Sequence, residues 1–214
     1  MYLDTANLEL IKSAYSLGVF KGVTTNPTIL SKEGIKRDII AKDILDIIDG
    51  ELYLQLVGNT CEDFIKDYKE ILKINDIRVG IKVPASFEGI KAIKEIRKNN
   101  KNIKILATVI YTVDQAILCA MAGADLVAPY VNRMENNSID SMNVISKIRN
   151  IYELKNLDTK IIAASFKNNA QVTNAYDNGA HYVTIPYEVL RSMTDNVLAI
   201  NNIEQFNKDY ESVK

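Results

Sequence analysis

The chain has 214 residues, of which 47% are hydrophobic and 25% charged, with a formal net charge of −1 at pH 7. These values are typical of a globular protein with a well-developed core, and they give no reason to expect nucleic acid or an anionic membrane as a partner. The opening segment MYLDTANLEL has no basic stretch followed by an apolar run, and no segment approaches the roughly 18 uninterrupted apolar residues of a membrane span. We therefore expect a cytoplasmic protein without signal peptide or membrane contact.

Short strand-like runs alternate with longer amphipathic segments along the whole chain. The predicted strands cover residues 2–4, 22–26, 51–56, 79–84, 103–109, 125–131, 160–165 and 182–186. The segments between them repeat apolar residues at helical spacing, as in NLELIKSAYSLG. The pattern thus predicts eight consecutive strand–helix units.

Capping signals agree with these units. Gly18, Gly123 and Gly179 follow apolar periodic runs, where a helix end often needs a positive φ angle. Ser86 is expected to begin one helix, and either Thr112 or Asp114 another. The tail is predicted to form an additional amphipathic helix over residues 201–213.

Eight such units indicate an α/β fold, a (β/α)8 TIM barrel, with residues 1–214 in one domain. The alternative is an open, doubly wound sheet. The absence of a GxGxxG turn after the first strand argues against a dinucleotide crevice of that kind.

Candidate metal ligands are scarce. The chain has one histidine, His181, and two cysteines, Cys61 and Cys119, and Cys119 lies on an apolar helical face as a core residue would. A zinc-dependent aldolase or hydrolase usually needs two or three histidines. We therefore expect metal-free chemistry.

Polar residues gather where the predicted strands end, which is where a barrel of this type places its active site. Seven consecutive strands each contribute at least one, and together these are Asp4, Thr24, Asn26, Gln55, Lys82, Thr108, Tyr130, Asn132, Arg133, Ser165 and Lys167. Taken singly, most have an ordinary structural explanation, such as a helix cap for Asp4, a turn for Asn26-Pro27, or solvated loop charges for Arg133 and Lys167.

Lys82 is the exception, because it lies within the apolar strand VGIKVP. Burial penalises the ammonium form, and each unit by which the pKa falls costs about 1.4 kcal/mol. A neutral amine in a polar pocket attacks carbonyls and forms a Schiff base. Gly80 and Pro84 share a face with Lys82, so small neighbours are expected to leave room around the amine.

The strings DTAN, GVTTNPTIL, IKVPAS, GADLVAPYVNR and AASFK resemble the transaldolase family, especially its short-chain branch with fructose-6-phosphate aldolase. The resemblance covers nearly the whole chain. It implies a (β/α)8 barrel, no cofactor, a Schiff base on Lys82, sugar phosphates and dihydroxyacetone as substrates, and a homodecamer.

The resemblance also implies roles for single residues. Asp4 would be the acid/base, and Thr24 and Asn26 would hold hydroxyls of the bound dihydroxyacetone unit. Thr108 would contact the catalytic water or the nearby hydroxyl. Ser165 would help to position the acceptor. Arg133, with Lys167 beside it, would bind the phosphate, since a guanidinium offers forked donors to phosphate oxygens.

One position in the third strand and one at the sixth strand distinguish the two reactions within the family. Transaldolases generally have glutamate and phenylalanine at these positions, and fructose-6-phosphate aldolases have glutamine and tyrosine. This chain has Gln55 and Tyr130 there. The sequence therefore favours an aldolase, with a transaldolase of the pentose phosphate pathway as the alternative. A third hypothesis, a noncatalytic barrel for phosphate binding or assembly, would be favoured by an incomplete polar ring, whereas every matched position is filled.

Overall fold

The computed structural model describes residues 1–74 and 76–214, and in it eight parallel strands close into a barrel in chain order. Each strand pairs with the next, and β8 pairs with β1. The predicted TIM barrel is confirmed, and the open sheet is wrong. The strands are β1 (Tyr2–Asp4), β2 (Gly22–Thr24), β3 (Glu51–Gln55), β4 (Val79–Pro84), β5 (Ile105–Ile110), β6 (Leu126–Pro129), β7 (Lys160–Ala163) and β8 (Tyr182–Ile185).

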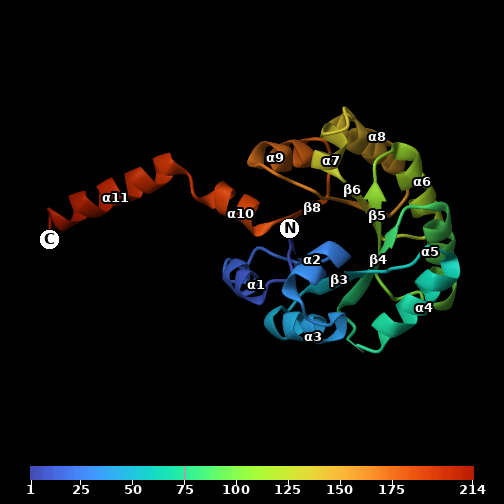
Figure 1. Cartoon of the computed structure of the whole chain (residues 1–214). Coiled ribbons are helices and arrows are strands. Elements are labelled where there is room, and N and C mark those ends of the chain that lie inside the picture. Colours follow the sequence, from blue (N-terminus) through green and yellow to red (C-terminus); the bar gives the residue numbers. More distant parts are fainter. Residues whose placement is uncertain (75) are drawn as a thin grey trace.

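Helices surround the barrel (Figure 1). Most of the core lies between strands and helices, where Val23, Leu52 and Ile81 are fully buried, while Tyr53, Leu106 and Ile162 belong to a second cluster. The register places that cluster on the inner face with Lys82, because Lys82 pairs with Leu106. The helices are α1 (Leu8–Tyr15), α2 (Pro27–Glu33), α3 (Arg37–Ile47), α4 (Cys61–Leu72), α5 (Phe87–Asn99), α6 (Val113–Ala122), α7 (Val131–Glu135), α8 (Ser141–Leu154), α9 (Asn169–Asp177), α10 (Tyr187–Thr194) and α11 (Val197–Glu211).

Several strands end earlier than predicted, because helix caps take over their last residues. Asn26, expected within the second strand, is the N-cap of α2, and its side chain accepts a hydrogen bond from the backbone N–H of Ile29 at 3.0 Å. Pro27 at the first position of the helix favours this start, since it needs no backbone donor there. Likewise β6 ends at Pro129, and Tyr130 precedes the short helix α7.

Of the two candidate caps for α6, the structure selects Thr112, which forms a reciprocal capping box with Gln115. Ser86 caps α5 as predicted. Gly123, the C-cap of α6, has a φ of 107°, in the left-handed region that glycine tolerates best.

Gly89, in the first turn of α5, lets this helix approach the end of β4. A Cβ atom built at Gly89 would lie 1.8 Å from the carbonyl oxygen of Pro84, a distance no side chain can occupy. Pro84 is the last residue of the strand that carries Lys82. The absence of a side chain at Gly89 therefore helps to fix the strand end next to the amine.

The strand β5 contains an irregularity that the sequence pattern does not indicate. Its pairing with β6 shifts between Ala107 and Ile110, and Val109 has a φ of 62°. Positive φ is rare for a β-branched residue, and such backbone strain clusters at functional sites. The bulge lies directly beyond Thr108.

The helix predicted over residues 201–213 lies at Val197–Glu211 and begins four residues earlier, because the side chain of Asn196 caps its first turn. Figure 1 shows α11 extending away from the barrel. None of its residues is buried, and the side chains of Leu198, Phe206 and Tyr210 are 74%, 66% and 61% exposed. No helix among the described residues has the length and apolar character that crossing a membrane requires.

Candidate active site

A cavity of about 800 Å³ opens at the carboxyl ends of the strands. Nine of the eleven residues predicted for the site belong to it or to its rim. They are Asp4, Asn26, Gln55, Lys82, Tyr130, Asn132, Arg133, Ser165 and Lys167. The other two, Thr24 and Thr108, are fully buried behind the side chains that line the cavity.

The Lys82 side chain is only 3% exposed, inside the barrel. Its Nζ donates a hydrogen bond to the backbone carbonyl of Thr25 at 2.9 Å. Burial lowers the pKa of Lys82, and the nearby carboxyl group of Asp4 partly opposes that change. The site therefore favours the neutral, nucleophilic amine more than water does.

The sequence suggested that Gly80 leaves room around Lys82, but the structure shows another use of this glycine. A Cβ atom at Gly80 would lie 2.6 Å from the ring of Tyr53, so this space belongs to the aromatic packing of the barrel interior. Gln55 pairs with Lys82 in the register between β3 and β4 and also borders the cavity. The open side of Lys82 thus faces polar neighbours.

Asp4, at the end of β1, accepts a hydrogen bond of 2.7 Å from the hydroxyl of Thr24 on β2. That hydroxyl also lies 2.7 Å from the hydroxyl of Thr184 on β8. Burial raises the pKa of Asp4, while Lys82 and the Thr24 hydrogen bond act in the opposite direction. Thr24, assigned to substrate binding by the resemblance, uses its single hydroxyl proton on Asp4 in this structure.

Thr108 and Tyr130 form a second buried pair. Their hydroxyl oxygens are 2.9 Å apart, and the Tyr130 hydroxyl comes from the residue that follows β6. Burial raises the pKa of Tyr130, so its hydroxyl keeps its proton near neutral pH. Tyr130 lines the cavity, so its hydroxyl can contact a water molecule there, while the buried Thr108 holds that hydroxyl in place.

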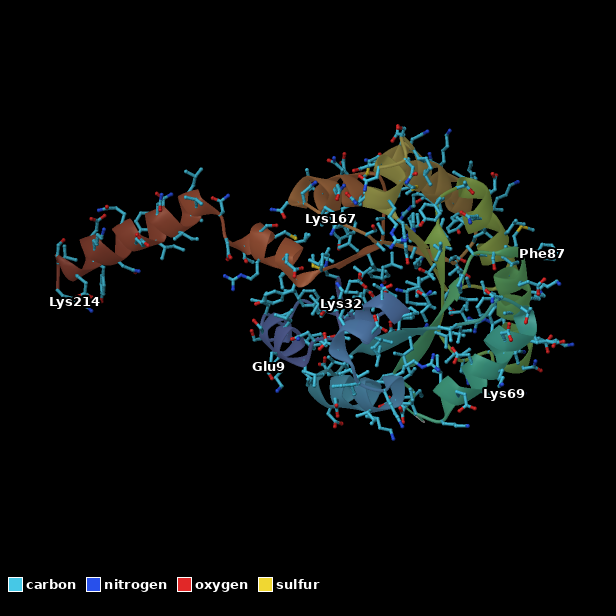
Figure 2. All side chains as sticks on the ribbon, viewed as in Figure 1. Glu9, Lys32, Lys69, Phe87, Lys167 and Lys214 are labelled. Atoms are coloured by element: carbon cyan, nitrogen blue, oxygen red, sulfur yellow. The ribbon has the colours of Figure 1, made fainter. Side chains whose placement is uncertain are left out.

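Cations collect on the rim of the cavity. Lys32 on α2, Arg133 on α7 and Lys167 after β7 all line it, and none of the three has a salt-bridge partner within residues 1–74 and 76–214. The guanidinium carbon of Arg133 lies 5.3 Å from the centre of the Tyr130 ring. Figure 2 places Lys32 and Lys167 toward the centre of the molecule, whereas Lys69 and Phe87 lie on its outer wall.

The loop after β7 is held by Gln171 of α9. Its side chain accepts a hydrogen bond from the backbone N–H of Lys167 at 2.8 Å and donates to Asn132 at 3.3 Å and to Glu135 at 2.5 Å. Ser165, between β7 and this loop, has a φ of 63°. The left-handed backbone there directs a small polar residue toward the cavity, which it lines.

Several residues of the site were missed by the reasoning from sequence, among them Lys32, Gln171 and Thr184. Lys32 and Gln171 lie inside helices, where charged and amide side chains are common and carry no signal of their own. Thr184 lies on β8, one strand beyond the seven whose ends were assigned. The alternation of β8 offered a signal, since Thr184 stands between the apolar residues Val183 and Ile185.

Comparisons with known proteins identify the family of this chain. The family model described as transaldolase/fructose-6-phosphate aldolase matches residues 1–214. The chain is 36% identical to a probable transaldolase of Clostridium kluyveri, and the match covers 100% of this chain and 98% of that protein. It is 38% identical to a probable transaldolase of Streptococcus pyogenes, with the same coverage.

Solved structures support the fold alone. A mandelate oxidase variant superposes with a TM-score of 0.62 at 11% identity, covering 88% of this chain and 63% of that chain. Inosine 5′-monophosphate dehydrogenase from Legionella pneumophila gives a TM-score of 0.61 at 16% identity, covering 87% of this chain and 58% of that chain. The match along the whole length and the identity to the two transaldolases show more than a shared barrel: this chain belongs to the transaldolase/fructose-6-phosphate aldolase family of enzymes.

Proposed function

We propose that the protein is a Schiff-base aldolase that cleaves fructose 6-phosphate to dihydroxyacetone and glyceraldehyde 3-phosphate, and forms it in reverse. The observation that carries this proposal is the buried Lys82 amine at the base of a polar cavity. Burial lowers the pKa of this lysine, so the free amine is available to attack a ketone.

The first steps follow from the positions of Lys82 and Asp4. The neutral amine adds to the C2 carbonyl of the ketose, and loss of water leaves an iminium ion that accepts electrons. Asp4 takes the proton of the C4 hydroxyl, and the bond between C3 and C4 breaks, with its electron pair moving into the iminium to give an enamine. The aldehyde product then departs. Asp4 suits this role because its carboxylate lies at the end of β1 and borders the same cavity.

The enamine has two fates, and they distinguish the two candidate reactions. Protonation of its carbon and hydrolysis by water release dihydroxyacetone and regenerate Lys82, which is aldolase chemistry. Addition to an incoming aldose phosphate, such as erythrose 4-phosphate, is transaldolase chemistry. The hydroxyl pair of Tyr130 and Thr108 supports the first fate, because it can orient a water molecule. The two relatives are named as probable transaldolases, which favours transfer to an aldose phosphate.

The rim supports a phosphorylated substrate. Arg133 lies over the ring of Tyr130 with its guanidinium outside any salt bridge among the described residues, and Lys167 and Lys32 border the same opening. Phosphate oxygens accept charge-assisted hydrogen bonds from such groups. We assign the phosphate of the sugar to this end of the cavity.

The exposed apolar side chains of α11 support an oligomer. A stripe containing Ile203, Phe206 and Tyr210 lies open to solvent on a helix without a buried residue. Apolar surface of this kind usually contacts another protein surface. We propose that the protein is a homo-oligomer, and the resemblance to short-chain relatives favours a decamer. Measuring the molar mass of the intact protein in solution tests this.

Trapping with borohydride tests the proposed chemistry directly. Reduction in the presence of dihydroxyacetone or fructose 6-phosphate should add a stable three-carbon or six-carbon adduct to the peptide containing Lys82 and abolish activity. Lys82→Met is the control and should give no adduct. An unmodified Lys82 peptide after loss of activity would disprove the Schiff base. Omitting erythrose 4-phosphate then separates the reactions, because only an aldolase keeps producing glyceraldehyde 3-phosphate without an acceptor.

A further inference from the structure

Asp4 is the end of a row of hydroxyl groups that crosses three neighbouring strands. Thr184 on β8, Thr24 on β2 and Asp4 on β1 are linked by two contacts of 2.7 Å each. Thr24 is fully buried and Thr184 is 2% exposed. Bulk water therefore does not reach the two threonine hydroxyls.

The direction of the row follows from counting protons. The Thr24 hydroxyl has one hydrogen, and it donates this hydrogen to Oδ1 of Asp4. The hydroxyl of Thr184 must then be the donor in the contact with Thr24. Each hydrogen bond polarises the next, so Thr184 strengthens the bond that Thr24 makes to the carboxylate.

We propose that Thr184 is a positioning residue for catalysis, which acts through Thr24 to hold Asp4 in its ionised, proton-accepting form. This assignment rests on the proposed function, in which Asp4 removes the hydroxyl proton of the ketose. It also explains why Thr24 is buried behind the cavity: its hydroxyl serves the carboxylate rather than the substrate.

The charged and titratable groups that face Asp4 come from two other strands. Among the described residues they are Lys82 on β4, which acts on the pKa of Asp4, and Tyr130 beyond β6, whose pKa Asp4 raises. The neighbours from β2 and β8 are the uncharged threonines. Lys82 is bonded to the carbonyl of Thr25 and Tyr130 to the hydroxyl of Thr108, so changing Thr184 should affect Asp4 first.

Removing the hydroxyl of residue 184 should raise the pKa of Asp4. If Asp4 is protonated, the row can reverse, with Asp4 donating to Thr24 and Thr24 donating to Thr184. Both forms therefore lose a hydrogen bond between Thr184 and Thr24 in Thr184→Val, but the ionised form loses more, because the charge of Asp4 polarises Thr24 and strengthens the bond that Thr24 accepts from Thr184. We expect an upward shift of roughly half a unit to one unit.

The test uses the full-length protein and two readouts. In Thr184→Val, the acid limb of the pH dependence of kcat/KM for fructose 6-phosphate should move to higher pH. An infrared titration, in which Asp4→Asn identifies the protonated carboxyl band, should show the same shift without requiring turnover. Thr184→Ser should restore the wild-type values, and Thr184→Cys, whose thiol is a weak donor, should lie between.

Thr159→Val is the matched control. Its hydroxyl is also buried and donates one hydrogen bond of 2.8 Å, to the carbonyl of Ala124, but it precedes β7 at the opposite end of the barrel. This variant should leave the acid limb unchanged. Equal effects of Thr159→Val and Thr184→Val, or an unshifted carboxyl band in Thr184→Val and Thr184→Cys, would overturn the assignment. Failure of wild-type protein to form a borohydride adduct would instead overturn the proposed function, because the infrared titration does not depend on it.

Discussion

Tyr130→Phe should change the fate of the enamine while leaving the entry of the substrate intact. The substitution removes one hydroxyl, which lies 2.9 Å from the hydroxyl of Thr108. It keeps the ring beneath the guanidinium of Arg133, 5.3 Å away, so the phosphate end of the cavity should be preserved. The proposed water molecule, however, loses the tyrosine hydroxyl that lines the cavity.

Placing a proton donor correctly in hydrolysis contributes about 100-fold to 10,000-fold in rate. We therefore expect production of glyceraldehyde 3-phosphate without an acceptor to fall about 100-fold in Tyr130→Phe. Transfer to erythrose 4-phosphate does not use this water, and its rate should stay within about threefold, a difference below 0.7 kcal/mol. A coupled assay for glyceraldehyde 3-phosphate, with and without erythrose 4-phosphate, gives both rates. Equal losses in the two rates, or an unchanged ratio, would remove Tyr130 from water handling.

The same substitution carries a stability cost that can be separated from catalysis. Thr108 is fully buried, so loss of the Tyr130 hydroxyl leaves its hydroxyl without a partner, which costs about 1–3 kcal/mol. Thr108→Val should cost less, because the Tyr130 hydroxyl is close enough to the cavity to be solvated. The double variant should therefore be more stable than Tyr130→Phe alone. Urea denaturation measures all three, and additive costs would show that the two hydroxyls do not interact.

Two further predictions concern the rim and the last helix. Arg133→Gln should raise the KM for fructose 6-phosphate roughly 10-fold to 100-fold with little change in kcat, as expected for loss of a hydrogen bond to a charged group. Lys69→Gln on the outer wall is the control. An unchanged KM for Arg133→Gln would show that the phosphate binds elsewhere. A chain that ends at residue 196 should form a smaller assembly than the intact protein, as measured by light scattering. Its barrel should stay folded, with the same circular dichroism per barrel residue, because α11 has no buried residue. The mass of a single copy for the intact chain would contradict the proposed oligomer.

The barrel and most of its site were predictable because they depend on local periodicity. Each strand alternates or runs apolar for a few residues, and its last residue falls at the same end of a parallel sheet. Lys82 stood out for the same reason, since a charged residue within an apolar strand breaks the pattern. Knowing the strand order was enough to bring Asp4, Gln55 and Lys82 to one cavity, which the structure confirms.

The pairs that define the chemistry were not predictable, because they depend on closure and on backbone geometry. Thr24 and Thr184 are separated by 160 positions in the chain, and they meet only because β8 pairs with β1 next to β2. The positive φ of Val109 has no marker such as glycine. Asn26 was expected at the end of the second strand, and the sequence did not indicate that it caps α2 through its bond to Ile29.

Burial acts with opposite sign on the two ionisable groups at the base of the cavity, which explains why the threonines are needed. It lowers the pKa of Lys82 and raises the pKa of Asp4, so burial alone favours a neutral amine beside a neutral acid. The proposed reaction needs the neutral amine together with an ionised carboxylate, and the positive charge of a protonated Lys82 cannot stabilise that carboxylate once the amine is neutral. Hydroxyl donors can, because they stabilise the carboxylate without adding a charge. The buried row from Thr184 through Thr24 therefore lets the same barrel interior hold an uncharged nucleophile and a charged base.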